Sequence, residues 1–260
     1  MSAPRVELFG CPFDRVTLGE AVAQAEAAIA ARRGLVQSVG VNLDQLVKMH
    51  KEPDFAKIIL SCDQITADGM PIVWMSRLFG DPLPERVPSV DIMNALLPVA
   101  AARGYRVFLL GAKEESLQAA RRSLEARLPG LAIVGARNGY FKEADEPGIV
   151  AEINAARTDI LLIAISSPKK EQFVERNRAA LTVPFVMGVG GAFDIEAGLF
   201  TRAPRLLQKV GLEWSWRFVQ EPKRMGPRIV EDLKFSRVIA REFVRRAAER
   251  RGAGKGGAPG

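Results

Sequence analysis

The sequence predicts an α/β fold in which a mostly parallel sheet is flanked by helices. Residues 106–110 and 159–165 are apolar almost throughout, which is typical of strands buried on both faces of a parallel sheet. Helix-length segments at residues 91–103 and 114–128 alternate with these runs, as they do in Rossmann-like folds. We place this core at residues 1–200 and expect a basic helical appendage at residues 201–251.

The other elements follow from apolar periodicity, helix-capping residues and glycine stops. They are strands at residues 6–9, 35–41, 131–134 and 183–189, and helices at residues 18–32, 72–79, 148–156 and 227–250. Asn42 and Pro168 are each expected to open a further helix, and a turn is expected between residues 58–60 and 65–67. A chain of 260 residues suits one large domain or two small lobes, at about residues 1–100 and 101–200.

Composition excludes several classes of protein. No run reaches the ~18 uncharged apolar residues of a spanning helix, and no basic segment followed by an apolar one opens the chain, so we expect it to fold and stay in the cytoplasm. Cys11 and Cys62 are too few and too far apart for a disulfide framework or a thiolate metal site, and we expect them to be reduced. For the single histidine, His50, we expect a surface or packing role.

The basic charge is concentrated at the end of the chain. Residues 201–260 contain 15 lysines and arginines against 6 acidic residues, a net charge of +9, whereas residues 1–200 carry −2. This asymmetry indicates an anionic partner, which could be a lipid surface, nucleic acid or a phosphorylated substrate. Trp214 and Trp216 among arginines favour a membrane interface, and the alternative is a helix packed on the core with a solvated charged face. Residues 252–260 are glycine-rich and expected to be disordered.

A glycine-rich segment follows the apolar run that starts at Phe185. Gly188, Gly190 and Gly191 come directly before Asp194, in the way that α/β proteins bring backbone amides to a phosphate. The spacing is not a dinucleotide fingerprint, because Phe193 stands where a third small residue is needed. The alternative is a glycine-rich turn that binds nothing.

Three more polar segments lie at predicted strand ends or on loops. Asp68 precedes Gly69 after an apolar segment, which indicates either a functional carboxylate at the sheet edge or an ordinary turn. Arg86 lies on a proline-rich loop, as a solvated side chain or as an anion clamp. In residues 166–171, Ser167 can cap a helix; alternatively Lys169, Lys170 and Glu171 neutralise a leaving diphosphate and orient a hydroxyl.

Taken in order, these segments resemble the WecG/TagA/CpsF family, glycosyltransferase family 26, over roughly residues 36–224. The matching pieces are Asn42 with Asp44, Ala67-Asp68-Gly69, Glu85-Arg86-Val87 with Asp91, Asn138-Gly139-Tyr140-Phe141, Pro168-Lys169-Lys170-Glu171, the segment 188–194, Arg202-Ala203-Pro204, Gly211-Leu212-Glu213-Trp214 with Arg217, and Glu221-Pro222. Each motif is weak alone, and the ordered set is specific.

The resemblance implies an inverting glycosyltransferase in cell-envelope or exopolysaccharide biosynthesis. Such an enzyme moves a hexosyl group from a UDP-sugar to a polyprenyl-diphosphate-linked saccharide at the inner face of the cytoplasmic membrane. The resemblance makes Asp68 the general base, and Asn42 and Glu171 belong to the same catalytic set. Arg86 and Lys170 would supply positive charge to the departing diphosphate.

The resemblance also assigns the binding residues. Tyr140 and Asp194 match contacts to the nucleoside, and the amides of the glycines at 188, 190 and 191 would serve the diphosphate. Arg202, Arg205, Arg217 and Arg224 are expected to contact the membrane or the lipid diphosphate. We expect no cofactor and no metal, although Asp194 with Glu196 could imitate a metal-binding pair.

Three departures from the family pattern leave the donor sugar open among N-acetylmannosamine-type, glucose and uronic acid derivatives. Gly40 replaces a threonine, which removes a hydroxyl near the acceptor or base; Lys170 replaces a glutamine, and Ser89 replaces a glycine. Two other functions compete, a nucleotide-dependent oxidoreductase and a non-catalytic membrane adaptor. We expect no nucleic-acid partner, and an oligomer is compatible with the sequence.

Overall fold

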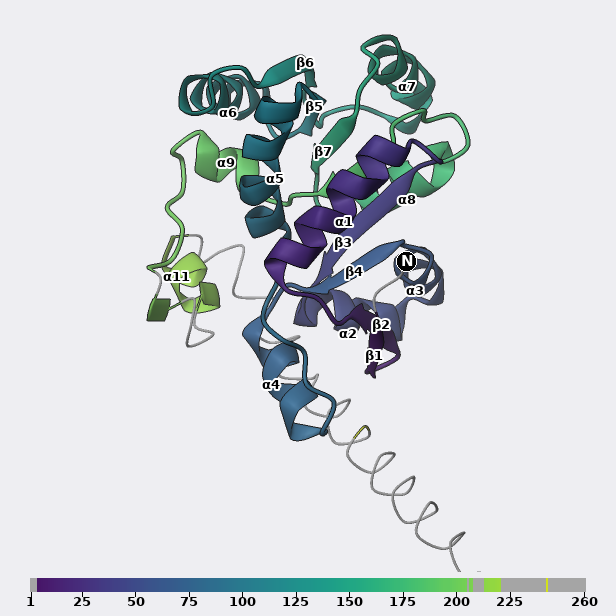
Figure 1. The fold of residues 1–260 in the computed structure, drawn as a ribbon, viewed down its shortest axis with the longest axis vertical. Helices are drawn as coiled ribbons and strands as arrows, with labels where there is room; N and C mark the ends of the chain where they lie inside the picture. The colour runs from purple at the N-terminus through teal and green to yellow at the C-terminus, as the bar shows by residue number, and fades with distance from the viewer. Residues whose placement is uncertain (1–3, 205, 208–212, 221–241, 243–260) are drawn as a thin grey trace, which may run out of the picture.

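A computed structural model of the chain describes residues 4–204, 206–207, 213–220 and 242. Its centre is a six-stranded parallel sheet with the strand order β4-β3-β8-β7-β5-β6 (Figure 1). These strands are β3 (Val36–Val41), β4 (Gln64–Ala67), β5 (Arg106–Gly111), β6 (Ala132–Arg137), β7 (Ile160–Ala164) and β8 (Phe185–Gly188). A separate antiparallel pair is formed by β1 (Arg5–Leu8) and β2 (Cys11–Asp14). The predicted parallel α/β fold is confirmed.

The helices connect the strands and cover the sheet. They are α1 (Leu18–Ala31), α2 (Leu43–Lys51), α3 (Pro53–Leu60), α4 (Met70–Leu78), α5 (Ser89–Arg103), α6 (Glu114–Arg127), the short η1 (Glu143–Asp145), α7 (Glu146–Ala155), α8 (Lys169–Asn177), α9 (Ala192–Glu196) and α11 (Glu213–Gln220). Local sequence explains several ends: Thr17 with Glu20 forms a capping box at the start of α1, and Gly104 ends α5 in the left-handed conformation.

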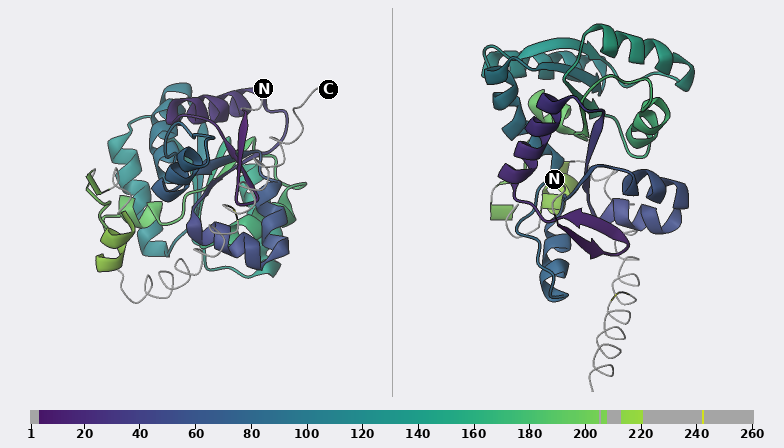
Figure 2. Two further views of the ribbon diagram at one scale, coloured as in Figure 1. Left: turned by 90° about the horizontal axis from the view of Figure 1, so that it is seen from below. Right: turned by 45° about the vertical axis from the view of Figure 1, so that its right-hand side comes forward.

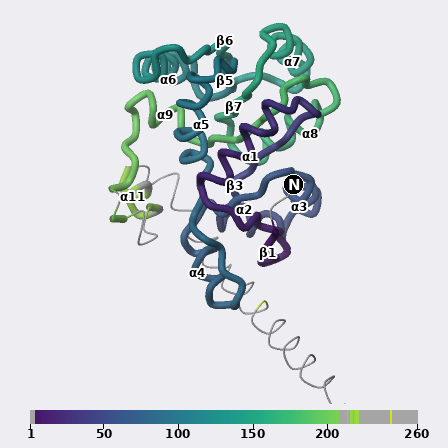
Figure 3. The backbone as a smooth tube through the Cα atoms, in the orientation of Figure 1, coloured from purple at the N-terminus to yellow at the C-terminus, as the bar shows by residue number. Residues whose placement is uncertain are grey.

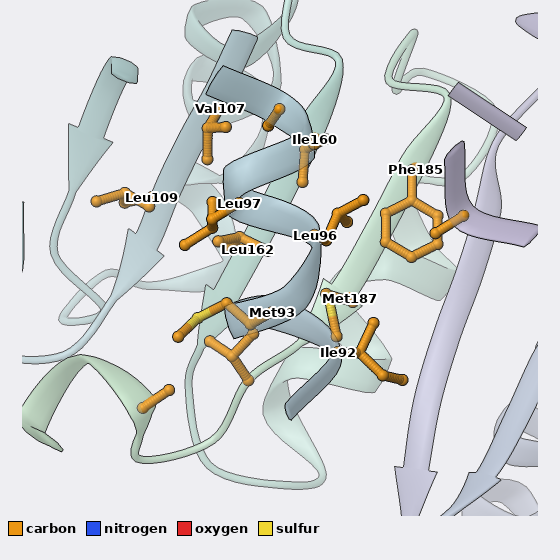
Figure 4. Packing of buried hydrophobic residues seen from close by; sticks show 14 of the residues in the cluster. Ile92, Met93, Leu96, Leu97, Val107, Leu109, Ile160, Leu162, Phe185 and Met187 are labelled. Atoms are coloured by element: carbon orange, nitrogen blue, oxygen red, sulfur yellow. The ribbon is translucent and has the colours of Figure 1, made fainter. Parts of the chain in front are cut away.

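The strands bury alternate residues against two helical layers. One face of β5, β7 and β8 packs on α1, α5, α6 and α9, and the other face packs on α7 and α8 (Figures 1 and 2). Figure 4 shows α5 lying across the strands, with Ile92 and Leu97 near Met187 and Leu162. A further cluster joins α2, α3 and the hairpin of β1 and β2 to β3 and β4. Burial on both faces is the reason that these strands are apolar throughout.

Several elements were absent from the sequence-based prediction, namely β2, β4, α3, η1 and α9. The strand β2 contains Pro12, which argues against a strand in general but is tolerated in a two-stranded ribbon. The helix α3 begins with Pro53 at its first position, a start signal that the prediction did not use. A turn was expected between residues 58–60 and 65–67. In the structure residues 58–60 end α3, and residues 65–67 belong to β4.

Other predictions concern single residues and the tail. Cys11 and Cys62 are free and buried, and His50 is exposed on α2. The predicted helix at residues 227–250 and the tail at 252–260 lie outside the described residues. Within the described part of the chain, no helix is both long and apolar enough to cross a membrane. The sheet joins strands from both sides of residue 100, since β8 lies between β3 and β7, and the position of a lobe boundary stays a prediction.

Candidate active site

The carboxyl ends of β3 and β4 place Asp68 at the edge of the sheet. Asp68 directly follows β4, and its backbone amide donates to the carbonyl of Val41 at the end of β3 (2.9 Å). The amide of Val87 donates to the carbonyl of Ala67 (2.9 Å), which holds the loop carrying Arg86 beside the end of β4. Polar groups at this edge of an open parallel sheet lie where such folds bind ligands.

Two arginines and two carboxylates form an arginine cluster next to this loop, made of Arg86, Asp91, Arg202 and Glu213. Arg86 reaches Glu213 at 2.5 Å and Asp91 at 3.7 Å, and its side chain is only 12% exposed. The interpretation of Arg86 as a solvated side chain is therefore wrong. Arg202 reaches the other oxygen of Asp91 at 2.5 Å and lies 3.8 Å from Glu213. Two regions far apart in the sequence, residues 86–91 and 202–213, thus meet in one network of charges.

Arg202 of the arginine cluster lies close enough to Asp68 for the two charges to interact. Burial of its guanidinium opposes the charge, but the hydrogen bond to Asp91 and the nearby carboxylates of Glu213 and Asp68 raise the pKa of Arg202. Its Nε and Nη2 atoms are buried without a hydrogen-bond partner among the described residues. Spare donors beside a carboxylate suit the binding of an anionic group.

A second polar chain crosses from β3 to α8. The side chain of Asn42 accepts from the backbone amide of Gln45 (3.1 Å) and so caps α2, while the Gln45 side-chain oxygen accepts from the Asn42 backbone amide (3.1 Å). Gln45 also donates to Glu171 at 3.4 Å, and Lys170 forms an ion pair with Glu171 at 2.5 Å. Asn42, Lys170 and Glu171, which the sequence analysis grouped as catalytic, are therefore linked, and Asn42 has a structural task.

Gly188 makes room for this ion pair. A Cβ atom at this position would lie 2.5 Å from Cε and 2.8 Å from Cδ of Lys170, so the lysine stem crosses the end of β8 where a side chain is missing. Glu171 is 2% exposed, and its Oε2 has no hydrogen-bond partner among the described residues. A buried carboxylate oxygen without a donor is costly, and a hydroxyl of a bound ligand would satisfy it.

Ser167 does not play the part that local sequence predicts. The helix α8 begins at Lys169 with Pro168 as its cap residue, and no side chain caps it. The Ser167 hydroxyl is buried and lacks a hydrogen-bond partner among the described residues. The expected serine cap is wrong, because the chain leaves β7 through Ser167 and turns into the helix only one residue later.

The loop that carries Tyr140 lies over the ends of β5 and β7. The amide of Ala112 donates to the carbonyl of Ala164, and the amide of Gly139 donates to the carbonyl of Ala112, both at 2.9 Å. The connections that leave β5 and β7 pack on opposite faces of the sheet, the topological arrangement beside which α/β proteins bind nucleotides. Tyr140 is 74% exposed at this point, so its ring is available for stacking.

The glycine segment after β8 opens toward free space. Gly190 has a φ of +54°, and a Cβ atom at either Gly190 or Gly191 would have no neighbour within 4 Å. The helix that follows, α9, has only five residues, so the expectation of a phosphate at a helix start rests on the loop amides. Asp194 is half-buried there, while Glu196 is bound to Arg127 at 2.8 Å.

Comparison with known proteins decides the class of enzyme. A family model described as "Glycosyl transferase WecG/TagA/CpsF family" matches residues 6–249. The chain belongs to this family. It is therefore a glycosyltransferase, and the two competing interpretations, an oxidoreductase and a non-catalytic adaptor, are wrong.

Curated relatives of this WecG/TagA/CpsF glycosyltransferase come from Staphylococcus aureus. The proteins from strains MW2 and NCTC 8325 / PS 47 are named N-acetylglucosaminyldiphosphoundecaprenol N-acetyl-beta-D-mannosaminyltransferase. Each is 27% identical over 225 residues, which cover 85% of this chain and 87% of the relative.

The structure of this WecG/TagA/CpsF member adds residues that the sequence analysis did not select. Asp91 and Glu213 stood in its motifs without a role, and both bind the arginines. Gln45 was missed, although its spacing from Asn42 fits a capping box. Of the remaining predicted arginines, Arg205 and Arg224 lie outside the described residues, and Arg217 lies on α11 without a described side chain.

Proposed function

We propose that this glycosyltransferase moves a hexosyl group from a UDP-sugar to a polyprenyl-diphosphate-linked saccharide during the synthesis of a cell-envelope polymer. The observation that carries the proposal is the position of Asp68, a half-buried carboxylate at the sheet edge with Arg202 and the arginine cluster beside it. The names of the relatives support a lipid-linked acceptor and make N-acetylmannosamine the first donor sugar to test.

Asp68 acts as the general base in this proposal. An acceptor hydroxyl is a poor nucleophile, so the Asp68 carboxylate takes its proton while the oxygen attacks the anomeric carbon. The bond from that carbon to the oxygen of UDP breaks on the opposite side, and UDP leaves with the bonding electron pair. One displacement inverts the anomeric centre.

The departing diphosphate requires positive charge or amide donors. Arg86 and Lys170 supply charge, and the amides around Gly190 and Gly191, where the segment opens toward free space, supply hydrogen bonds. In the structure both cations are held by carboxylates, Arg86 by Glu213 and Lys170 by Glu171. A diphosphate therefore competes with Glu213 for Arg86, which stays in place because Asp91 also holds it.

Tyr140 and Asp194 bind the nucleoside in this proposal, and the chemistry is independent of metal. The contact between Glu196 and Arg127 supports the second point, because it engages the glutamate of the only Asp-x-Glu pair that the sequence analysis considered for a metal. Transfer that survives EDTA is the expected result. Loss of transfer that magnesium or manganese restores would contradict it.

The C-terminal segment gives the enzyme its place at the membrane in this proposal. The net charge of +9 in residues 201–260 would attract an anionic surface, which positions the enzyme peripherally at the inner face of the cytoplasmic membrane. Arg205, Arg217 and Arg224 contribute there, and Arg202 is placed to serve the acceptor diphosphate. Removal of residues 221–260, which carry +6 of this charge, should weaken binding to anionic vesicles strongly, and unchanged binding would refute this role.

The donor and acceptor are tested together. The enzyme is incubated in detergent with polyprenyl-diphosphate-N-acetylglucosamine and, in separate reactions, UDP-N-acetylmannosamine, UDP-glucose or UDP-glucuronic acid. The lipid product is then separated, and its mass is measured by mass spectrometry. We expect a single hexosyl addition from one donor, with inverted configuration. Binding of UDP without transfer from any donor would refute the proposed acceptor.

A further inference from the structure

Two positions where this chain departs from the family pattern meet in space next to Asp68. Gly40 lies in β3, and Ser89 is the first residue of α5. A Cβ atom on Gly40 would lie 2.5 Å from the Ser89 hydroxyl oxygen, 3.3 Å from the Ser89 amide nitrogen and 3.2 Å from Cβ of Asp68. The Ser89 hydroxyl thus fills the space that a side chain at position 40 would occupy.

The glycine at position 40 is explained by this contact. Gly40 pairs with Thr66 in the regular register of β3 and β4, and it is absent from the residues with positive φ. Its backbone conformation is therefore open to any residue. What excludes a side chain is the Ser89 hydroxyl at 2.5 Å, since real Cβ atoms do not approach another atom so closely.

The Ser89 side chain has no structural task that accounts for its burial. Ser89 is 7% exposed as a residue; its hydroxyl makes no hydrogen bond to a described residue, yet the oxygen is not one of the fully buried polar atoms. It does not cap α5 either, because the cap position is Pro88. The hydroxyl is therefore within reach of a ligand at the edge of the site, which can supply its hydrogen bond.

We propose that Ser89 is an acceptor-binding residue, whose hydroxyl bonds to a polar group of the acceptor sugar beside the hydroxyl that Asp68 deprotonates. The inference rests on the proposed function. A serine hydroxyl both donates and accepts, so it suits a sugar hydroxyl or an acetamido group. The sequence analysis expected a missing hydroxyl at Gly40; in space that hydroxyl is supplied from α5 instead of β3.

The first test is Ser89→Ala, which removes the hydroxyl and keeps Cβ. We expect KM for the acceptor to rise about 2- to 12-fold, the equivalent of one net hydrogen bond, with KM for the UDP-sugar and kcat nearly unchanged. Ser116→Ala is the matched control, because Ser116 is also a buried serine in a first helical turn, that of α6. Thermal unfolding of both variants checks that the fold is intact.

The second test moves the hydroxyl between the two elements. Gly40→Thr alone should lower kcat/KM for the acceptor more than about tenfold, because its Cβ displaces the Ser89 hydroxyl and crowds Asp68. Ser89→Gly alone should raise KM for the acceptor, as Ser89→Ala does. The double variant Gly40→Thr with Ser89→Gly removes the 2.5 Å clash and supplies a hydroxyl again, and only a small shift relieves the 3.2 Å contact with Asp68. It should return kcat/KM to within about threefold of the wild type.

The outcomes separate the two proposals. If the wild type transfers sugar and Ser89→Ala has the same KM for the acceptor, the role of Ser89 is overturned and the proposed function stands. The same holds if the double variant is no more active than Gly40→Thr. Failure of the wild type to transfer to any polyprenyl-diphosphate-linked sugar would overturn the proposed function, and this inference with it.

Discussion

Replacing Lys170 by methionine should destabilise the protein strongly at neutral pH. Methionine keeps the length of the lysine stem that crosses Gly188 but removes the ammonium 2.5 Å from Glu171. Glu171 is 2% exposed, so water cannot replace the lost partner, and only the amide of Gln45 at 3.4 Å remains. The carboxylate is then buried without compensation.

The size of the effect follows from two limits. Breaking a buried ion pair from one side costs ~3 to 5 kcal/mol. Protonating an ordinary carboxyl with a pKa of about 4.3 at pH 7 costs about 3.7 kcal/mol. This is an upper limit on the loss of stability, because the variant can protonate the carboxylate instead of keeping it charged. We expect a loss of about 3 kcal/mol in the free energy of unfolding at pH 7. At pH 5 the same route costs about 1 kcal/mol, so the loss should shrink as the pH falls.

Urea unfolding of the wild type and three variants measures this pair. Lys169→Met is the matched control, because Lys169 is the exposed neighbour on the same helix, and it should change stability by less than about 0.5 kcal/mol. Adding Glu171→Gln to Lys170→Met should recover much of the loss, since the uncompensated charge is gone. A stability of Lys170→Met within about 0.5 kcal/mol of the wild type at pH 7 would refute the buried ion pair.

Three further predictions concern the nucleotide side and the core. Tyr140→Ala should weaken UDP binding about tenfold in calorimetry without lowering the melting temperature, because the ring is 74% exposed; unchanged affinity would exclude it from the nucleoside site. Gly111→Ala should cost more than about 2 kcal/mol in urea unfolding, since φ is +127° and Cβ would lie 2.5 Å from the Ala164 backbone, whereas Gly148→Ala in α7 should be neutral or stabilising. Burial raises the pKa of Cys62 to about 12, so iodoacetamide at pH 8 should label the native protein far more slowly than the urea-unfolded chain.

The fold could be predicted where a strand is buried on both faces. The strands β5 and β7 are apolar on both faces, so they show no alternation of polar and apolar residues. Helices separate them along the chain, which gives the repeating order of strand and helix that is typical of α/β folds (Figure 3). The short β2 could not be predicted, because Pro12 contradicts local strand propensity and only pairing with β1 stabilises it. Local sequence patterns thus predict the central strands of the sheet, whereas a short strand such as β2 depends on pairing with its neighbour.

The site was predictable in its residue types but not in its pairing. Asp68 and the glycine segment stand at strand ends, where sequence order alone indicates a ligand crevice. The partner of Arg86 could not be read from the sequence, since Glu213 lies 127 positions away. The compensation between Gly40 and Ser89 was likewise hidden, because the contact between them exists only in the folded chain.

The measurement closest to the central proposal is sugar transfer by Asp68→Asn, compared with Asp54→Asn, whose side chain is 94% exposed on α3. If Asp68 is the general base, kcat should fall by about 10² to 10⁴ while UDP affinity and melting temperature stay at wild-type values. The control should transfer at the wild-type rate. A kcat for Asp68→Asn within about threefold of the wild type would contradict the assignment of Asp68 as the base.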